Sequence, residues 1–206
     1  MSSSAADTRR PLASRSTAWA AWAARTLARS GATPNQVSVA SVVFAGVGAA
    51  LLLDARLLAL VGAAACVQLR LLCNLLDGMI AVEGGRRTRT GVLYNEVPDR
   101  IADSAFLVAA GIGADAPWLG WLAALAAMLT AYVRALGGSL GQPQDFRGPM
   151  AKPHRMAALT AGCLGASVEI ATLGSRWTLV AMLGVIAAGA LVTAARRLSG
   201  IANRMP

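Results

Sequence analysis

The sequence is poor in charge, in aromatic side chains and in histidine. Only 14% of its 206 residues are charged and 5% are aromatic, there is one histidine, and 56% are hydrophobic. A mean hydropathy of +0.55 is too high for an ordinary soluble domain. The length is enough for one domain, so we predict a single membrane-embedded domain.

Cysteine is also scarce, and nucleic-acid binding is not indicated. Cys66, Cys73 and Cys163 all lie inside apolar runs without paired spacing, which favours small buried side chains over disulfides or zinc. The net charge of +9 comes from basic residues in the gaps between apolar runs. That placement is typical of a protein at an anionic membrane surface, so we expect no nucleic-acid partner.

The N-terminal part lacks the apolar core and cleavage site of a signal peptide. Residues 1–14 are polar and predict a disordered tail, and residues 15–206 predict the single membrane domain. Within 15–30, Trp19 and Trp22 alternate with arginines at helical spacing. This predicts an amphipathic helix in the membrane interface, with a frayed polar leader as the alternative.

Six apolar runs follow. A bilayer core about 30 Å thick requires about 20 apolar residues per helix. The runs predict an all-α polytopic fold with six transmembrane helices and both termini on one side. Their many Ala and Gly residues permit close helix contacts. The predicted spans are 36–53, 57–82, 92–114, 117–138, 156–174 and 177–196.

The basic residues predict the orientation of these spans. Fifteen fall on the side of the termini, and only Arg56 and Arg176 fall on the other side. By the positive-inside rule, both termini and the loops near 83–91 and 139–155 are expected in the cytoplasm. We expect the membrane to be a bacterial inner membrane.

A polar cluster interrupts the second and third spans. Asn74 and Asp77 are three residues apart, and Asn95, Asp99 and Asp103 are each four apart, so both sets share one helix face. Ionisable groups inside a membrane cost about 2.5–3.5 kcal/mol each on insertion scales and are functional candidates by default. Such oxygen ligands suit Mg²⁺ or Mn²⁺, and Mg²⁺ is usually shared with substrate phosphates. The cluster therefore predicts a metal–diphosphate site.

An internal ion-pair network is the alternative reading of this cluster. In it, Arg70 and Arg100 would neutralise the three aspartates. That reading does not account for Gly78 and Gly91, which would let a bulky ligand approach the backbone closely.

The pattern is similar to the signature of the CDP-alcohol phosphotransferase family. That signature begins with two aspartates three residues apart, the second followed directly by Gly-x2-Ala-Arg. Eight or nine residues later comes a glycine, with two further aspartates four and eight residues after it. Every spacing and five of eight identities are kept here. Thr33–Gln36 also resembles the family sequence before the first span, and the layout matches over most of 15–200. The stretch reads Asn74-x2-Asp77-Gly78-x2-Ala81-Val82, eight residues, Gly91-x3-Asn95-x3-Asp99.

Three positions depart from the family. Asn74 and Asn95 replace its first and third acids, and Val82 replaces its Arg. Amide oxygens still ligate hard cations, but each change removes one negative charge. We therefore expect weaker metal binding or fewer metal ions.

The resemblance implies a step of phospholipid biosynthesis, the transfer of a phosphatidyl group from CDP-diacylglycerol to an alcohol with release of CMP. It also implies Mg²⁺ or Mn²⁺ as cofactor, Asp99 as general base, and a homodimer, because family members commonly dimerise. The implied metal ligands are Asn74, Asp77, Asn95 and Asp99, with Asp103 as a further candidate; the implied nucleotide-lipid residues are Gly78, Ala81, Gly91 and Asn35.

The loop after the fourth span predicts the acceptor side. Arg134, Lys152, His154 and Arg155 would meet the cytoplasmic surface of the cluster. Arg clamps phosphate bidentately and Lys adds a point charge, so a phosphorylated acceptor such as glycerol 3-phosphate or inositol phosphate is expected. Cytoplasmic loops also gather basic residues by topology alone. A catalytically silent CDP-lipid-binding relative and a cation-binding transport protein are the alternative functions.

Overall fold

The computed structural model describes residues 17–31, 33–83 and 91–205, without the side chains of 81–83 and 91–95. The predicted tail, 1–14, lies outside these ranges. The described residues form helices and no strand, which confirms the all-α prediction. The helices are α1 (Ala18–Arg29), α2 (Pro34–Asp54), α3 (Leu57–Glu83), α4 (Gly91–Gly113), α5 (Pro117–Ser139), α6 (Lys152–Leu173) and α7 (Trp177–Ala202).

The six long helices lie where the six apolar runs are, but two of them extend several residues beyond their runs. Helix α6 begins at Lys152 instead of 156, and α7 continues to Ala202 instead of 196. Pro153 lies in the first turn of α6, where its missing N–H costs no helical hydrogen bond. The apolar runs stop at the first charged residues, whereas the helical backbone continues through them.

Five helices are long and apolar enough to cross a membrane, so the chain is an integral membrane protein. They are α2, α3, α5, α6 and α7. Helix α4 has 23 residues, which at 1.5 Å each span about 34 Å. Helix α4 is not among the five apolar helices of the described chain because it carries four charged residues, Glu96, Asp99, Arg100 and Asp103.

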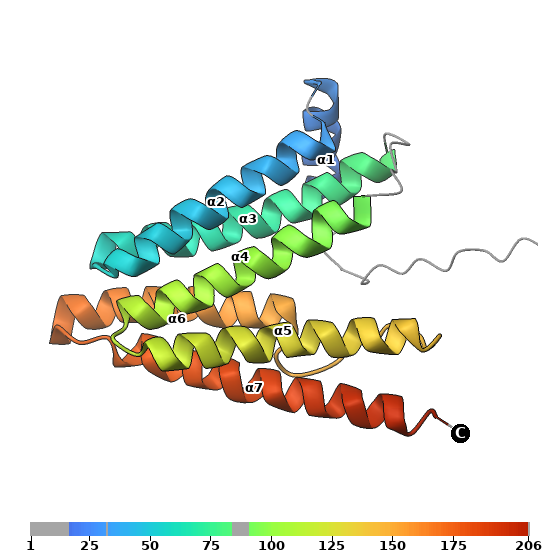
Figure 1. The fold of residues 1–206 in the computed structure, drawn as a ribbon. Helices are drawn as coiled ribbons and strands as arrows, with labels where there is room; N and C mark the ends of the chain where they lie inside the picture. Colours follow the sequence, from blue (N-terminus) through green and yellow to red (C-terminus); the bar gives the residue numbers. More distant parts are fainter. Residues whose placement is uncertain (1–16, 32, 84–90, 206) are drawn as a thin grey trace, which may run out of the picture.

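The bundle has two halves. Figure 1 shows α2, α3 and α4 together on one side and α5, α6 and α7 on the other, and contacts of α4 with α5 and of α3 with α6 join them. Small residues permit this packing. A Cβ atom on Gly111 of α4 would lie 2.6 Å from the Cα of Gly120 in α5. The two helix backbones therefore touch.

Helix α1 packs against the end of α3 through alanines. Ala20 and Ala24 are fully buried there, whereas Trp19 and Trp22 are 52% and 66% exposed. The predicted helix at 15–30 is thus present from 18 to 29, with its tryptophans facing outward. Its place in the membrane interface stays a prediction.

Candidate functional site

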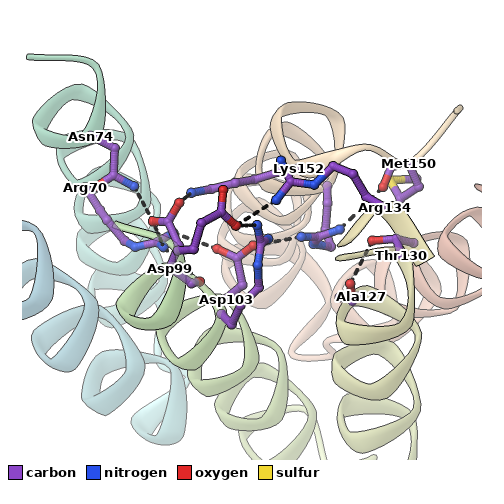
Figure 2. A network of polar contacts seen from close by, with 12 residues as sticks. Arg70, Asn74, Asp99, Asp103, Ala127, Thr130, Arg134, Met150 and Lys152 are labelled. Atoms are coloured by element: carbon purple, nitrogen blue, oxygen red, sulfur yellow. Dashed lines mark hydrogen bonds and ion pairs between the residues drawn. The ribbon is translucent and has the colours of Figure 1, made fainter. Parts of the chain in front are cut away.

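Asp99 is the centre of a polar network between α3, α4 and α6. Its Oδ1 accepts hydrogen bonds from Arg70 Nη2 at 2.8 Å and from Asn74 Nδ2 at 2.5 Å, both from α3. Its Oδ2 pairs with the ammonium group of Lys152, at the start of α6. Figure 2 shows these three side chains converging on the carboxylate. Both oxygens of Asp99 are therefore occupied by donors.

Asp103 lies one turn deeper on α4 and holds two buried arginines. Its Oδ1 accepts from Arg70 Nη1 and its Oδ2 from Arg155 Nη2, each at 2.7 Å. The side chains of Asp103, Arg70 and Arg155 are 3%, 1% and 1% exposed. Arg70 also lies over the Phe106 ring, 5.8 Å from its centroid. Arg70 therefore bridges the two aspartates and ties α3 to α4.

Asn74 and Asp77 contact α2 through two serines. Ser41 Oγ donates to Asn74 Oδ1 at 2.7 Å, and Ser38 Oγ donates to Asp77 Oδ2 at 2.8 Å. Asp77 is 5% exposed, and no cation pairs with it among the described residues. It is the carboxylate of the cluster that retains the most capacity to bind a further cation.

A second acidic centre lies nearer the N-terminal end of α4. Glu96 Oε2 accepts from Arg100 Nη2 at 2.5 Å and from Arg134 Nη2 of α5 at 2.7 Å. Arg134 also lies over Phe146, 5.3 Å from its centroid. The ion-pair alternative placed both Arg70 and Arg100 on the aspartates. In the structure Arg100 pairs with Glu96 instead. Arg70 does pair with Asp99 and Asp103, which also pair with Lys152 and Arg155.

The loop between α5 and α6 is anchored on α7, and this anchoring positions Lys152. Met150 N donates to Thr193 Oγ1 at 3.0 Å, and Arg197 Nε donates to Arg147 O at 2.9 Å. Within the loop, hydrogen bonds from Arg147 hold the pKa of the Asp145 carboxyl below its usual range. Helix α6 therefore begins from a fixed point beside α4.

The predicted site residues separate into three groups. Asn74, Asp77, Gly78, Asp99, Asp103, Lys152 and Arg155 lie on the helices that form the network, and Arg134 joins it through Glu96. Asn35 and His154 are exposed and make none of these contacts. Asn95, Ala81 and Gly91 lie on α4 and α3, but their side chains are outside the described residues.

Sequence reasoning missed Ser38, Ser41 and Arg197. The two serines are three residues apart directly after Thr33–Gln36, so their shared face toward α3 was readable from spacing. Thr33 and Gln36 form a capping box that starts α2 with Pro34 in its first turn. Arg197 carried no signal, because its carbonyl partners depend on the tertiary fold.

The charges of the network balance internally. The network holds three cations and three carboxylates; Arg70, Lys152 and Arg155 all pair with Asp99 or Asp103, and none of them pairs with Asp77. Across the described residues, no group of three or more His, Cys, Asp and Glu side chains is placed to hold a metal ion. Among the described side chains, the oxygen donors without a cationic partner are those of Asp77 and the amide of Asn74, and Asp99 pairs with Arg70 and Lys152. Oxygen donors of this kind suit a hard divalent cation.

Comparison with known proteins places this site in a family. No family model matches the chain. The phosphatidylinositol phosphate synthase of Mycobacteroides abscessus is 31% identical over 188 residues, covering 86% of this chain and 81% of the relative. That of Mycolicibacterium smegmatis is 29% identical over 186 residues, covering 86% and 81%.

Solved structures share the fold. Mycobacterium tuberculosis phosphatidylinositol phosphate synthase in complex with manganese and citrate has a TM-score of 0.72 at 22% identity, covering 91% of this chain and 93% of that one. The same enzyme with CDP-DAG bound has a TM-score of 0.70, covering 88% and 92%. Fold and site define a helical membrane protein with a carboxylate and amide cluster inside its bundle. The chain belongs to the CDP-alcohol phosphotransferase family.

Proposed function

We propose that this chain transfers a phosphatidyl group from CDP-diacylglycerol to an alcohol, releasing CMP. One observation carries the proposal. Asn74 and Asp77 on α3 and Asp99 on α4, which keep the family spacing, lie at the same end of the bundle as Lys152 and Arg134. The relatives named phosphatidylinositol phosphate synthase support the same reaction.

The reaction needs a base beside the acceptor and a stabilised leaving group. The acceptor oxygen attacks the phosphorus that carries the diacylglycerol, the bond to the CMP oxygen breaks, and CMP leaves with those electrons. Asp99 receives the proton of the acceptor hydroxyl. Asp99 Oδ2 accepts from Lys152 alone and keeps a second lone pair. An ammonium group that stays on this oxygen opposes its protonation, and Lys152 is the donor with the more exposed side chain, 20% against 1% for Arg70.

A divalent cation would be held by Asp77, Asn74 and Asp99, with Asn95 as the further ligand that the family spacing implies. When bound, Mg²⁺ or Mn²⁺ would neutralise charge on the diphosphate and on departing CMP. Asp103 is better suited to positioning Arg70 and Arg155, because those arginines occupy both of its oxygens. We therefore propose it as a positioning residue and no longer as a metal ligand.

The acceptor is proposed to be anionic and to approach from the cytoplasmic end. Arg134 and Lys152 have side chains 16% and 20% exposed, so an incoming phosphate can reach them, whereas Arg155 is almost fully buried. His154 and Asn35 are exposed at the same end and stay candidates for acceptor and nucleotide contacts. An acceptor phosphate would replace Asp99 or Glu96 as the partner of these cations.

We also propose six spans in a single membrane domain of a bacterial inner membrane, with both termini in the cytoplasm. Helix α4 would be the sixth span, since the side chains of its buried Asp103 and half-buried Asp99 are paired within the bundle and do not face lipid. A homodimer is proposed from family membership alone.

CMP release tests the function. Purified protein with Mn²⁺ and CDP-diacylglycerol is given a panel of alcohols that includes inositol phosphate and glycerol 3-phosphate. We expect CMP release with an anionic acceptor, and a loss of about 10²–10⁴-fold in Asp99→Asn. Asp145→Asn, in the neighbouring loop, serves as the control and is expected to keep its activity.

A catalytically silent relative is the second candidate, favoured by the two asparagines and by the cations seated on Asp99. It would bind the nucleotide-lipid without releasing CMP with any acceptor, water included. Cation transport is less favoured. The buried polar residues of the described helices gather at the cytoplasmic half, and in the outer half only Ser167 is among them.

A further inference from the structure

Lys152 is the only lysine in a chain of 19 basic residues. Every other cation in the polar network is an arginine. Its single ammonium group is seated on Asp99, the last acid of the family motif, and its side chain is 20% exposed. Arg70 and Arg155, by contrast, are almost fully buried and donate to Asp103 from opposite sides.

These contacts make Lys152 the replaceable donor of the network. Arg70 is fixed by two carboxylates, by the Asp99 carbonyl oxygen at 3.1 Å and by the Phe106 ring. Lys152 donates to one carboxylate oxygen and extends from the first residue of α6. An ammonium group is a compact charge on a flexible four-carbon stem, so it can leave one partner without disturbing the helices.

Lys152 also takes the position that a divalent cation needs. A cation held by Asp77 and Asn74 that also binds Asp99 would share this carboxylate with the ammonium group, which pairs with Oδ2. Two cations at one carboxylate repel each other. Ammonium and metal ion therefore compete for Asp99.

We propose that Lys152 is an internal counter-cation that occupies Asp99 until a divalent cation displaces it, and that this exchange lowers the metal affinity of the free protein. The proposal rests on the proposed function in placing the cation at Asp77 and Asp99. The displaced ammonium group is then available to the anionic acceptor. In the exchange itself, Lys152 acts through Asp99 and is a positioning residue.

Mn²⁺ binding tests the exchange without any substrate. Free Mn²⁺ is measured by electron paramagnetic resonance during titration of the detergent-solubilised protein. We expect Lys152→Met to bind Mn²⁺ about tenfold more tightly, as when the ammonium group occupies Asp99 about nine-tenths of the time. Lys152→Arg, which retains a cation, and Arg147→Met, which removes an exposed cation from the same loop, should stay within about twofold of wild type. Unchanged or weaker binding by Lys152→Met, or equal tightening by Lys152→Arg, overturns the proposal.

The wild-type protein offers a second measurement that needs no variant. An acylating reagent modifies side-chain amines, and Lys152 carries the only one. Mass spectrometry should show that Lys152 is acylated severalfold faster with Mn²⁺ than in buffer without divalent cations. The acylation rate of the N-terminal amine should be the same in both conditions. Acylation that Mn²⁺ leaves unchanged or slows overturns the proposal. If CMP is never released but both exchange signals appear, the proposed function fails and the role of Lys152 stands.

Discussion

Asp103 shows how strongly one buried carboxylate can be committed to structure. Its two oxygens neutralise two arginines that are each 1% exposed. Removing one partner of a buried ion pair leaves an uncompensated charge, which costs about 3–5 kcal/mol. We expect Asp103→Asn to unfold at a markedly lower temperature in detergent. Asp54→Asn, which breaks an exposed pair with Arg56, should cost less than about 1 kcal/mol. Equal melting temperatures for the two variants would contradict this role of Asp103.

The effect of a substitution at Asn74 on stability is expected to depend on whether a metal ion is bound. Its amide group donates to Asp99 at 2.5 Å, and its carbonyl oxygen accepts from Ser41. Asn74→Asp restores the first acid of the family motif but places a second negative charge beside Asp99. We expect a lower melting temperature than wild type without metal, and a larger Mn²⁺-induced increase. Asn203→Asp, at the end of α7, is the control and should show neither change. A Mn²⁺ response equal to that of wild type would argue against Asn74 as a ligand position.

The residues of the cluster were partly predictable. The aspartates and asparagines stand out because ionisable and amide groups are expensive in an apolar run, and their spacing puts them on shared faces. Their partners could not be assigned from spacing. Lys152 follows Asp99 by 53 residues, so its contact depends on how the loop before α6 is anchored to α7.

At the scale of the helix, two glycines of α2 differ in their surroundings. A Cβ atom at Gly48 would lie 2.7 Å from Cε1 of Phe106 and 2.8 Å from the Cβ of Cys66, whereas nothing lies within 4 Å of one at Gly46. Gly48→Ala should cost about 1–3 kcal/mol through overpacking. Gly46→Ala should be neutral or stabilise by up to about 1 kcal/mol, because Ala favours the helix. Thermal unfolding in one detergent compares the pair, and equal values would contradict the close approach of α2 to α3 and α4.

The helices themselves were predictable, since six apolar runs separated by charged or Gly- and Pro-containing segments correspond to the six long helices. Their ends were less so. The fifth predicted run begins at 156 and the sixth ends at 196, where hydropathy falls, whereas the helices begin at Lys152 and end at Ala202, because capping and the helical backbone depend on neighbours such as Pro153. Helix α4 does not have the composition of an apolar span because it carries charged residues, and the aspartates among them are neutralised by partners on other helices of the folded bundle.

At the scale of the molecule, the network joins the two halves of the bundle. Asp99 and Asp103 on α4 pair with Lys152 and Arg155 on α6, and Glu96 pairs with Arg134 on α5. These contacts lie where the halves meet, so an exchange at Asp99 would act on the junction between them. The sequence could not reveal this, because apolar periodicity does not specify which helices become neighbours.

The crossing of α4 decides between six spans and five, and thiol labelling in intact cells tests it. Asp115 follows α4 and its side chain is 91% exposed, and Leu140 follows α5 and is also exposed. In a background with Cys66, Cys73 and Cys163 changed to Ala, we expect Asp115→Cys to react with a membrane-impermeant reagent from outside. Leu140→Cys should react only after the cells are opened, because α5 returns the chain to the cytoplasm. Labelling of both positions from the same side would mean that α5 does not cross the membrane, and labelling of Asp115→Cys only in opened cells would mean that α4 does not carry the chain across.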